Sequence, residues 1–290
     1  MEPILNFQLR PRARFFIVLL SLIFTAELTA CSTSDTLDIA APQAEPSKYA
    51  AIVVDAKDGK ILYEVAADQI RYPASLAKMM TLYLTFEALE NGRLSRTTMI
   101  PLSATAARQP ATKLYMKAGD TIDVDTAIRA LIVKSANDVA TALAENLAGS
   151  EKAFARQMTA KGRSLGMTRT VFTNASGLPD PKMTTTARDM AVLGMALRRD
   201  FPQYYSYFAL RSFQFRGKTV RGHNKLLGMV AGADGIKTGY IKASGYNLAA
   251  SVNRNGRSLV AVVMGGKTGK ARDAHMAQLL TATFNRSRRK

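Results

Sequence analysis

The stretch from Pro73 to Leu89 constrains the fold most, because it is apolar on nearly every side of the helix that it predicts. A proline suits the first position of a helix, where its missing N–H group would lack a partner anyway. A helix that is apolar all round belongs in a core rather than on a surface. The chain must therefore build a domain around this stretch. With 290 residues, 47% of them hydrophobic, it is long and apolar enough to do so.

A serine and a lysine, Ser75 and Lys78, lie three residues apart at the start of this predicted helix. Residues at this spacing share a helix face, with Cβ atoms roughly 5–6 Å apart. A serine becomes a nucleophile only beside a base, and burial or a nearby cation can lower the pKa of a lysine enough for it to be that base. The pattern is weak alone, since Ser287 and Lys290 repeat it. Without support from other segments, Ser75 would be an ordinary serine near a helix start.

The rest of the chain predicts a mixed α/β (α+β) domain with an antiparallel sheet. Strand-like runs at 50–55 and 60–64 flank a Lys-Asp-Gly turn and predict a hairpin. The aromatic run at 201–208 is interpreted as packing. The remaining segments predict helices at 125–133, 138–147, 151–164, 187–198 and 273–285, and strands at 211–216, 235–241, 245–253 and 257–264. Because strands come first and again late, we expect the first and last of them to lie together.

Two further motifs could line a cleft beside the serine. Ser135 and Asn137 stand between two predicted helices, on a loop where both side chains can face a cleft. Lys237-Thr238-Gly239 lies in a predicted strand, where the absent side chain of the glycine would let a substrate backbone approach closely. Each motif has a second copy, at 251–253 and at 267–269. Order and context must therefore decide between the copies.

The first 30 residues have the features of a secretory signal, with three arginines before an apolar run of about eleven residues. That run is too short to span a bilayer comfortably. Leu28-Thr29-Ala30-Cys31 is similar to a bacterial lipobox, so we expect an exported protein lipidated on Cys31 and anchored to a membrane. The alternative is a simple signal cut near Ala30. Residues 31–48 lack periodicity and are rich in Ser, Thr, Ala and Pro, which predicts a flexible tether.

Composition narrows the possible partners. One Cys and two His leave too few ligands for a zinc site, so we expect neither a metal nor another cofactor. Removing residues 1–30 takes three arginines and two glutamates from 40 basic and 22 acidic residues, which leaves a net charge of +17. This charge favours an anionic polymer or surface of the cell envelope. Export and the lack of a nucleic-acid-binding module argue against nucleic acid. A basic surface without a partner is the alternative.

The three motifs, in this order, resemble those of the serine D-Ala-D-Ala carboxypeptidases of peptidase family S11, which are low-molecular-mass penicillin-binding proteins. The resemblance covers about residues 49–285. Its flanks are more specific than the motifs themselves: Pro73-Ala74-Ser75-Leu76-Ala77-Lys78-Met79-Met80-Thr81, Ser135-Ala136-Asn137-Asp138-Val139-Ala140, Leu165-Gly166-Met167, Thr186-Ala187-Arg188-Asp189-Met190-Ala191, Asp234-Gly235-Ile236-Lys237-Thr238-Gly239 and Gly245-Tyr246-Asn247-Leu248.

The resemblance implies a β-lactamase/transpeptidase-like fold, in which helices flank an antiparallel sheet and an all-helical subdomain is inserted. Residues 49–290 would form this penicillin-binding DD-peptidase domain. Family members usually carry a β-rich second domain and a C-terminal amphipathic anchor. The printed sequence ends at Lys290, and we expect an N-terminal lipid on Cys31 to replace that anchor.

The resemblance also implies roles for the residues that chemistry singles out. Ser75 attacks the penultimate D-Ala carbonyl of a peptidoglycan stem peptide, and Lys78, kept neutral by burial and by Lys237, removes the serine proton. The backbone N–H groups of Ser75 and Tyr240 form the oxyanion hole. Ser135 relays a proton to the leaving D-Ala. Penicillins and other β-lactams acylate Ser75 in the same way and leave slowly.

The remaining roles concern the substrate. Asn137 holds the substrate amide and orients Lys78. Lys237 supplies positive potential, and Thr238 binds the terminal carboxylate. Arg272 stands where the family tends to place an arginine for the same carboxylate, with a solvated surface arginine as the alternative. Tyr240 replaces a histidine that is common in the family. His223 is interpreted as structural rather than catalytic.

Three rival functions remain. A class A β-lactamase needs a glutamate on a loop between the second and third motifs, yet no Glu follows Glu151 in this chain, so we expect slow deacylation of penicillin. A DD-endopeptidase that cleaves peptidoglycan crosslinks shares the same motifs. A non-catalytic peptidoglycan-binding scaffold is the alternative from another class, and the complete motif set argues against it.

Overall fold

The computed structural model describes residues 39, 44 and 46–287. The expected signal, the lipidation site at Cys31 and most of the expected tether lie outside these residues.

The strands of the main sheet come from both ends of the described chain, as expected. Their order is β2-β1-β9-β8-β7, and each neighbouring pair is antiparallel. The bounds are β1 Ala50–Asp55, β2 Ile61–Val65, β7 Ala233–Ile241, β8 Gly245–Arg254 and β9 Arg257–Gly266. Pairing of β1 with β9 joins Ala50 to Met264 and Asp55 to Leu259. This pairing confirms the prediction that the first and last strands lie together.

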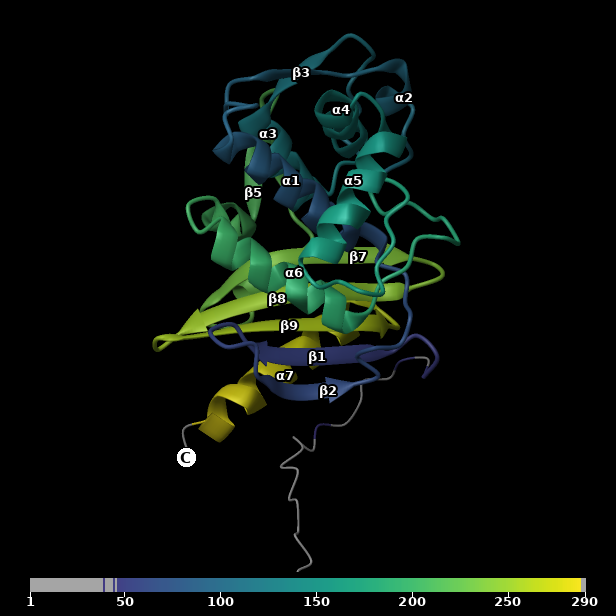
Figure 1. The fold of residues 1–290 in the computed structure, drawn as a ribbon. Helices are drawn as coiled ribbons and strands as arrows, with labels where there is room; N and C mark the ends of the chain where they lie inside the picture. Colours follow the sequence, from purple (N-terminus) through teal and green to yellow (C-terminus); the bar gives the residue numbers. More distant parts are fainter. Residues whose placement is uncertain (1–38, 40–43, 45, 288–290) are drawn as a thin grey trace, which may run out of the picture. The chain divides into compact units, whose positions relative to one another are not determined.

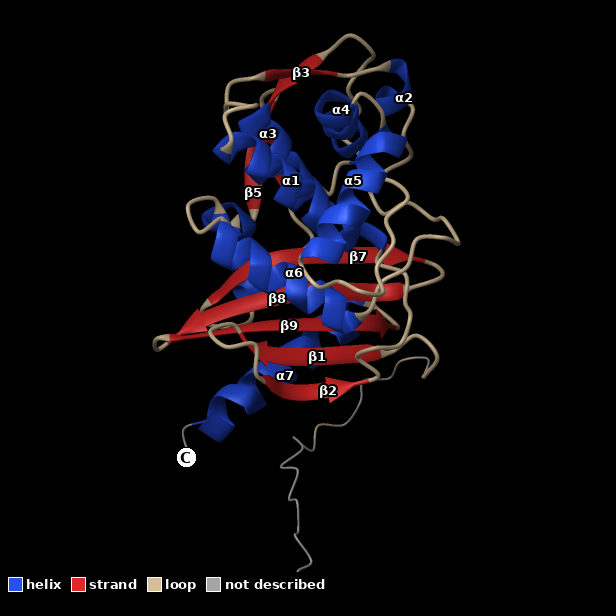
Figure 2. Ribbon diagram, in the orientation of Figure 1, coloured by secondary structure: helices blue, strands red, loops and turns tan. Residues whose placement is uncertain are grey.

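Four shorter strands stand outside this sheet. Strands β3 (Met99–Pro101) and β4 (Thr121–Asp123) form one ribbon, and β5 (Ser212–Phe215) and β6 (Lys218–Arg221) form another. The strand expected at 211–216 therefore pairs with the segment that follows it and not with the main sheet. The β3–β4 ribbon lies among the helices of the inserted region (Figure 2), so this subdomain is not all-helical as expected.

The helices match the predicted segments closely. The longer ones are α1 Lys78–Glu90, α3 Val124–Arg129, α4 Asn137–Ala148, α5 Glu151–Ser164, α6 Ala187–Asp200 and α7 Gly269–Ser287, and the short α2 spans Ala104–Ala107. Single turns of other geometry are η1 Ala74–Ala77, η2 Ala130–Lys134, η3 Tyr205–Ala209 and η4 Lys225–Gly228. Helix α7 begins four residues before its predicted start. The aromatic run around η3 is mostly buried and packs on Phe86, as its interpretation required.

Two apolar cores lie on opposite faces of the sheet. Helices α1 and α6 cover one face, and α7 covers the other (Figure 1). Alternate residues of β1 face the two sides, with Ile52 in the first core and Val53 in the second, because successive strand side chains point in opposite directions. Helix α1 is fully buried for most of its length, so the prediction of a core helix is confirmed.

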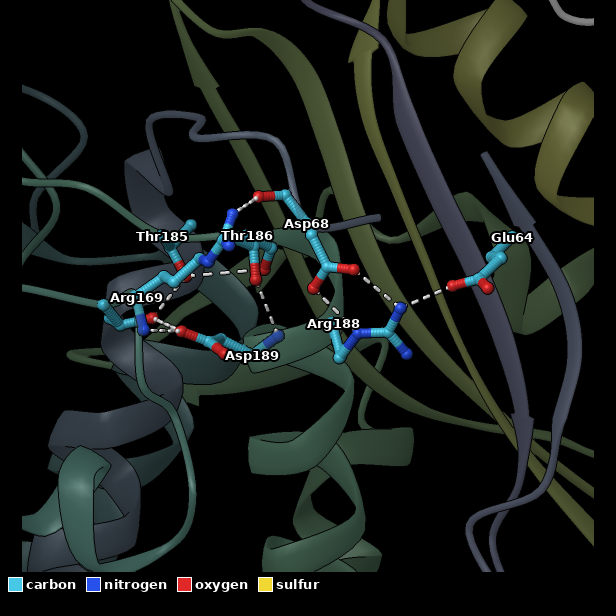
Figure 3. A network of polar contacts seen from close by, with 8 residues as sticks. Glu64, Asp68, Arg169, Thr185, Thr186, Arg188 and Asp189 are labelled. Carbon is cyan, nitrogen blue, oxygen red and sulfur yellow. Dashed lines mark hydrogen bonds and ion pairs between the residues drawn. The ribbon is translucent and has the colours of Figure 1, made fainter. Parts of the chain in front are cut away.

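A polar network fastens the segment that leads into the first motif. Arg188, at the start of α6, bonds both carboxylate oxygens of Asp68 and one of Glu64 (Figure 3). The backbone of Arg71 exchanges hydrogen bonds with Thr185. The buried carboxylate of Asp189 accepts bonds from the Arg169 backbone N–H and the Thr170 hydroxyl. These contacts fix residues 68–71 against α6, a few residues before Ser75.

Candidate active site

Ser75 lies in the η1 turn, one turn before α1 begins. In a 3₁₀ turn, side chains three residues apart stand nearly above one another. Lys78 Nζ accordingly lies 3.2 Å from Ser75 Oγ. The predicted pairing of the two residues is present, although the α-helix itself begins only at Lys78. Ala74 has a φ of +50°, a left-handed conformation that an alanine rarely adopts. The neighbours of the turn must therefore hold it in place.

Lys78 is completely buried, and its amine has two further oxygen partners. Nζ lies 2.7 Å from Asn137 Oδ1 and 2.6 Å from the Ser176 carbonyl oxygen. Burial, reinforced by the positive charge of Lys237, holds the pKa of Lys78 well below its usual range. A neutral amine has two N–H donors and one lone pair. The amide and carbonyl oxygens take both donors, so the lone pair is left to accept the Ser75 hydroxyl proton.

Asn137 has a fixed orientation. Its Nδ2 donates to the Pro110 carbonyl oxygen at 2.9 Å, which turns Oδ1 toward Lys78. Its backbone N–H donates to the Thr112 carbonyl oxygen. The sequence placed Asn137 on a loop, whereas it is the first residue of α4. Helix α4 and the 110–112 segment together position this side chain.

Ser135 carries a buried hydroxyl that has no hydrogen-bond partner among the described residues. Its backbone is left-handed, with φ +61°, at the end of η2. The Thr112 hydroxyl donates to its carbonyl oxygen and holds this turn. A buried polar atom without a partner is costly, so its presence on the cavity wall indicates a group that a ligand would satisfy.

The turn at 174–178 supplies the third partner of Lys78, the Ser176 carbonyl oxygen, and was not predicted from the sequence. Asn174 Oδ1 accepts hydrogen bonds from the backbone N–H groups of residues 176–178. An asparagine side chain that caps its own turn, with a glycine inside it, is the signal that could have revealed this segment. Thr81 of α1 donates to the Ala175 carbonyl oxygen, and Glu151 of α5 accepts from the Ala175 N–H.

Gly177 brings this turn against the η1 turn that carries Ser75. Its φ is +81°, and a Cβ placed there would lie 1.8 Å from the Ala74 carbonyl oxygen. Only glycine fits both the conformation and the contact. The 174–178 turn thus packs directly against the strained residue next to Ser75.

Lys237 on β7 is buried, and its Nζ donates to the Thr238 carbonyl oxygen at 2.9 Å. Burial, assisted by the charge of Arg272, lowers the pKa of Lys237 to about 7. Thr238 and Gly239 follow along the same strand and line the cavity.

Gly239 has a further reason for lacking a side chain besides the one that the sequence suggested. A Cβ at this position would lie 3.1 Å from both the Pro73 carbonyl oxygen and the Ser75 backbone nitrogen. This contact with the η1 turn is by itself enough to require a glycine, and the close approach of a substrate backbone stays a prediction, since Gly239 also lines the cavity. This contact places the Ser75 N–H close to β7, the strand that carries Tyr240.

Arg272 is buried and not a solvated surface residue, so that alternative is wrong. Two of its nitrogens bond Asp273 Oδ1, and Nη1 donates to the Asn247 carbonyl oxygen at 3.1 Å. Arg272 lies in the first turn of α7 and lines the cavity.

Asn247 is a second residue whose role the sequence did not reveal. Its fully buried Nδ2 donates to the carbonyl oxygens of Tyr72 and Pro73, and its Oδ1 accepts from the Gly265 N–H. Asn247 therefore joins β8 and β9 to the segment just before Ser75.

The motifs meet at one cavity of about 910 Å³. Its lining includes Ser75, Ser135, Asn137, Thr238, Gly239, Tyr240 and Arg272, while the second copies of the motifs at 251–253 and 267–269 do not line it. Tyr240 is 52% exposed and packs against Tyr246 in a tilted arrangement, with ring centroids 4.2 Å apart.

His223 also lines this cavity, with an exposed side chain and a pKa lowered mainly by partial burial and then by nearby cations. It makes no hydrogen bond to any other residue in the described ranges. This position does not fit the structural role that the sequence favoured, because an exposed ring without a partner stabilises little.

No helix in the described ranges is long and apolar enough to cross a membrane. No three His, Cys, Asp or Glu side chains among the same residues are grouped closely enough to hold a metal ion.

Comparison with known proteins identifies the family. The sequence matches the family of D-alanyl-D-alanine carboxypeptidases, Peptidase S11, over residues 38–268. The chain belongs to this family. It is 36% identical over 279 residues to D-alanyl-D-alanine carboxypeptidase DacA of Escherichia coli K12, an alignment that covers 92% of this chain and 69% of that protein.

Solved structures agree with this membership. Penicillin-binding protein D2 of Listeria monocytogenes, in its ampicillin-bound form, is 30% identical with a TM-score of 0.75, covering 84% of this chain and 100% of that one. A mutant of the Streptomyces K15 DD-transpeptidase, 22% identical over 81% of this chain and 96% of its own, shares the fold with a TM-score of 0.75. The expected β-lactamase/transpeptidase-like fold is confirmed.

Proposed function

We propose that the protein is a serine DD-carboxypeptidase, which removes the terminal D-Ala from peptidoglycan stem pentapeptides through an acyl-enzyme at Ser75. We further propose that penicillins acylate the same serine. Family membership and a relative that binds ampicillin support both statements. The observation that carries the proposal is the environment of Lys78, whose buried amine lies 3.2 Å from Ser75 Oγ with its two N–H donors directed to other oxygens.

The proposed first step forms the ester and releases D-Ala. Lys78 Nζ accepts the hydroxyl proton while Ser75 Oγ attacks the penultimate D-Ala carbonyl carbon. The N–H groups of Ser75 and Tyr240 stabilise the oxyanion. The proton on Lys78 is then passed through the Ser135 hydroxyl, which lacks a partner in the described chain, to the amine that departs as the C–N bond breaks, and Lys78 is neutral again. Thr238 and Arg272 hold the terminal carboxylate, and the buried Lys237 supplies positive potential. Water then hydrolyses the ester.

Labelling with a fluorescent penicillin tests this proposal directly. The wild-type protein is expected to carry the label through denaturing electrophoresis, because the bond to Ser75 is covalent. The Ser75→Ala variant should not be labelled, and its unfolding midpoint should match that of the wild type. A Ser287→Ala variant, in the second Ser-x-x-Lys copy, is the matched control and should be labelled normally. Undiminished labelling of Ser75→Ala would contradict the assignment of the nucleophile.

The acyl-enzyme formed with penicillin should be long-lived. Glu151 does not line the cavity, because its carboxylate accepts hydrogen bonds from the Ala175 N–H and the Thr141 hydroxyl. It is therefore not placed to activate a deacylating water. Rapid hydrolysis of nitrocefin would favour a β-lactamase instead.

A DD-endopeptidase is the closest alternative, since the same nucleophile could attack a D-Ala carbonyl within a crosslink. Incubation with purified pentapeptide and crosslinked muropeptides separates the two activities. Release of free D-Ala from pentapeptides supports the carboxypeptidase. Conversion of dimers to monomers without release of D-Ala would identify an endopeptidase. Absence of both penicillin labelling and turnover of either substrate would leave the scaffold function.

For the location, we propose export to the periplasm and an anchor formed by lipid on Cys31, followed by a tether over residues 31–48. The lipobox-like sequence supports this proposal. Cells fed radioactive palmitate should incorporate label into the wild-type protein and not into Cys31→Ala. A wild-type protein that is unlabelled and soluble in the periplasm would contradict the anchor.

A further inference from the structure

The walls of the cavity differ sharply in charge. One wall comes from the 111–112 segment, the 135–137 motif and the 176–179 turn, and none of its lining residues is charged. The other comes from η4, the β7–β8 hairpin and the start of α7, and it carries every charged lining residue: Lys225, Lys242, Lys270, Arg272 and Asp273. A substrate in this cavity therefore meets positive charge from one side.

Three of these cations are available to a ligand. The carboxylate of Asp273 is already bound by Arg272. Lys225, Lys242 and Lys270 are exposed, and none of them forms an ion pair or a hydrogen bond through its amine with another described residue. Nothing else on the cavity wall neutralises them, so an anionic group entering the cavity would be attracted to this side.

The position of Lys242 just beyond β7 relates it to a bound peptide. Within the described part of the chain, β7 is an edge strand of the sheet, so its outer edge is free to pair with a substrate. Thr238 and Tyr240 lie on this strand, and Lys242 follows in the turn that begins after Ile241. A peptide with its terminal carboxylate at Thr238 and its reacting carbonyl at Tyr240 would run toward this turn, so the side chain of its preceding residue would extend toward Lys242.

Lys270 lines the same cavity from α7. Tyr240 packs against Tyr246, and a Cβ built on Gly269 would lie 3.7 Å from the Tyr246 ring. The two tyrosine rings thus connect the end of β7 to the first turn of α7, where Lys270 follows Gly269. Both lysines and both rings belong to the lining of this one cavity.

We propose that Lys242 and Lys270 form a second anion subsite, which binds a carboxylate on the residue N-terminal to the D-Ala-D-Ala pair. This proposal rests on the proposed function and adds a substrate preference to it. The enzyme would select stem peptides whose third residue carries a free carboxylate over peptides in which that group is an amide.

A matched pair of synthetic peptides tests the subsite. Nα-acetyl-L-Glu-D-Ala-D-Ala and Nα-acetyl-L-Gln-D-Ala-D-Ala differ only in one carboxylate, and release of D-Ala is measured for both. We expect the mature wild-type protein to have about a fivefold higher kcat/KM for the Glu peptide, mainly through KM, since exposed ion pairs are individually weak. The preference should shrink as salt is raised from 0.05 to 0.5 M, because exposed charges are screened.

Substitutions then locate the preference. In Lys242→Gln/Lys270→Gln the two peptides should become equivalent, while the rate for the Gln peptide and labelling by fluorescent penicillin stay near the wild-type values. Lys267→Gln is the matched control, because Lys267 is an exposed lysine near Lys270 that does not line the cavity, and it should leave the preference intact.

The outcomes are distinguishable from a failure of the proposed function. Equal wild-type rates for the two peptides, or a preference retained by the double variant, would overturn the subsite, and the DD-carboxypeptidase would stand because D-Ala is released. Failure to release D-Ala from either peptide would overturn the proposed function and the subsite together.

Discussion

At the scale of single residues, the decisive feature is the saturation of the Lys78 amine by oxygens. Asn137 and Ser176 accept its two donors, and Pro110 fixes the direction of the Asn137 amide. Burial is the larger cause of the lowered pKa of Lys78, and the positive charge of Lys237 lowers it further. In the proposed mechanism the two lysines therefore have different tasks: Lys78 must be neutral to accept a proton, and Lys237 must be charged to attract a carboxylate.

The pH dependence of acylation should reveal this division. The pKa of Lys237 is lowered to about 7, so its positive charge is present below pH 7 and is lost as the pH rises through that value. We expect the second-order rate of acylation by benzylpenicillin, which carries a carboxylate, to fall above about pH 7. Stopped-flow measurements between pH 5 and 9 check this. A rate that stays flat up to pH 9 would contradict a role for the Lys237 charge.

The Lys237→Gln variant gives a second readout. It should lack the alkaline decline and react roughly tenfold more slowly or worse, as expected when a preorganised electrostatic group is removed. Its acidic decline should move to higher pH, because removal of the neighbouring cation raises the pKa of Lys78. An acidic limb that does not move would show that the two amines are not coupled.

At the scale of elements, the η1 turn Ala74–Ala77 is held by two other segments. It carries Ser75, the proposed nucleophile, and is called the nucleophile turn below. The 174–178 turn packs on Ala74 through Gly177, and β7 packs on the Ser75 backbone through Gly239. Asn247 of β8 adds hydrogen bonds to Tyr72 and Pro73. These contacts explain how Ala74 keeps a left-handed backbone. Ser75 is thus positioned less by its own helix than by segments far away in the sequence.

Substitution of Gly177 by alanine tests this arrangement. The new Cβ would meet the Ala74 carbonyl oxygen, a backbone atom that can move only if the nucleophile turn moves with it. We expect a loss of roughly 3 kcal/mol or more in the free energy of unfolding, from backbone strain plus the clash, and loss of penicillin labelling in the molecules that remain folded.

Gly59→Ala is the matched control for that substitution. Gly59 has a similar φ of +73°, but nothing lies within 4 Å of the added Cβ. Its cost should be only about 1 kcal/mol, from the conformation alone, with normal labelling. Urea denaturation of both variants checks the difference. Equal costs would mean that the 174–178 turn does not press on Ala74.

At the scale of the whole molecule, the sheet separates a catalytic side from a supporting side. The core against α1 and α6 carries the nucleophile turn, whereas the core between the sheet and α7 holds the sheet from behind. The second core contains a polar group, His275, whose Nε2 lies 2.8 Å from the Tyr49 hydroxyl oxygen. The side chain is 2% exposed, and its Nδ1 finds no partner in the described residues.

Acid should destabilise the domain through this histidine. Burial lowers the pKa of His275 from 6.5 to about 4, so the folded state resists protonation that the unfolded chain accepts. The stability is fully present above pH 6.5 and is lost as the pH falls toward 4, by about 2 kcal/mol from this group. Urea midpoints at pH 7 and pH 4.5 should fall less in His275→Gln than in the wild type.

His223→Gln is the matched control, because His223 is the other histidine of the chain and its ring is exposed. Because partial burial and nearby cations also lower the pKa of His223, the change in midpoint of this variant between the two pH values should be slightly smaller than that of the wild type and larger than that of His275→Gln. A wild-type response in His275→Gln would show that carboxylates, and not this histidine, govern the acid sensitivity.

The sequence by itself determined most of the longer elements and the identity of the motif residues. Periodicity marked helix α5 to the residue, and the all-round apolar pattern after Pro73 correctly indicated a buried helix, because both depend on residues close together in the chain. The spacing of Ser75 and Lys78 likewise sufficed to predict their contact. Motif order and flanks were enough to recognise the family.

Only the tertiary structure decided what surrounds those residues. The Ser176 carbonyl, the Asn247 amide and the contact behind Gly239 involve positions that backbone groups occupy after folding, and a backbone group has no signature in the amino-acid sequence. The burial of Arg272 could not be predicted either, because an arginine near a helix start can be solvated or buried. Its environment depends on whether Asp273 and Asn247 lie within hydrogen-bonding distance after folding. Local patterns fix which groups are present, whereas burial and distant backbone contacts fix their protonation and direction.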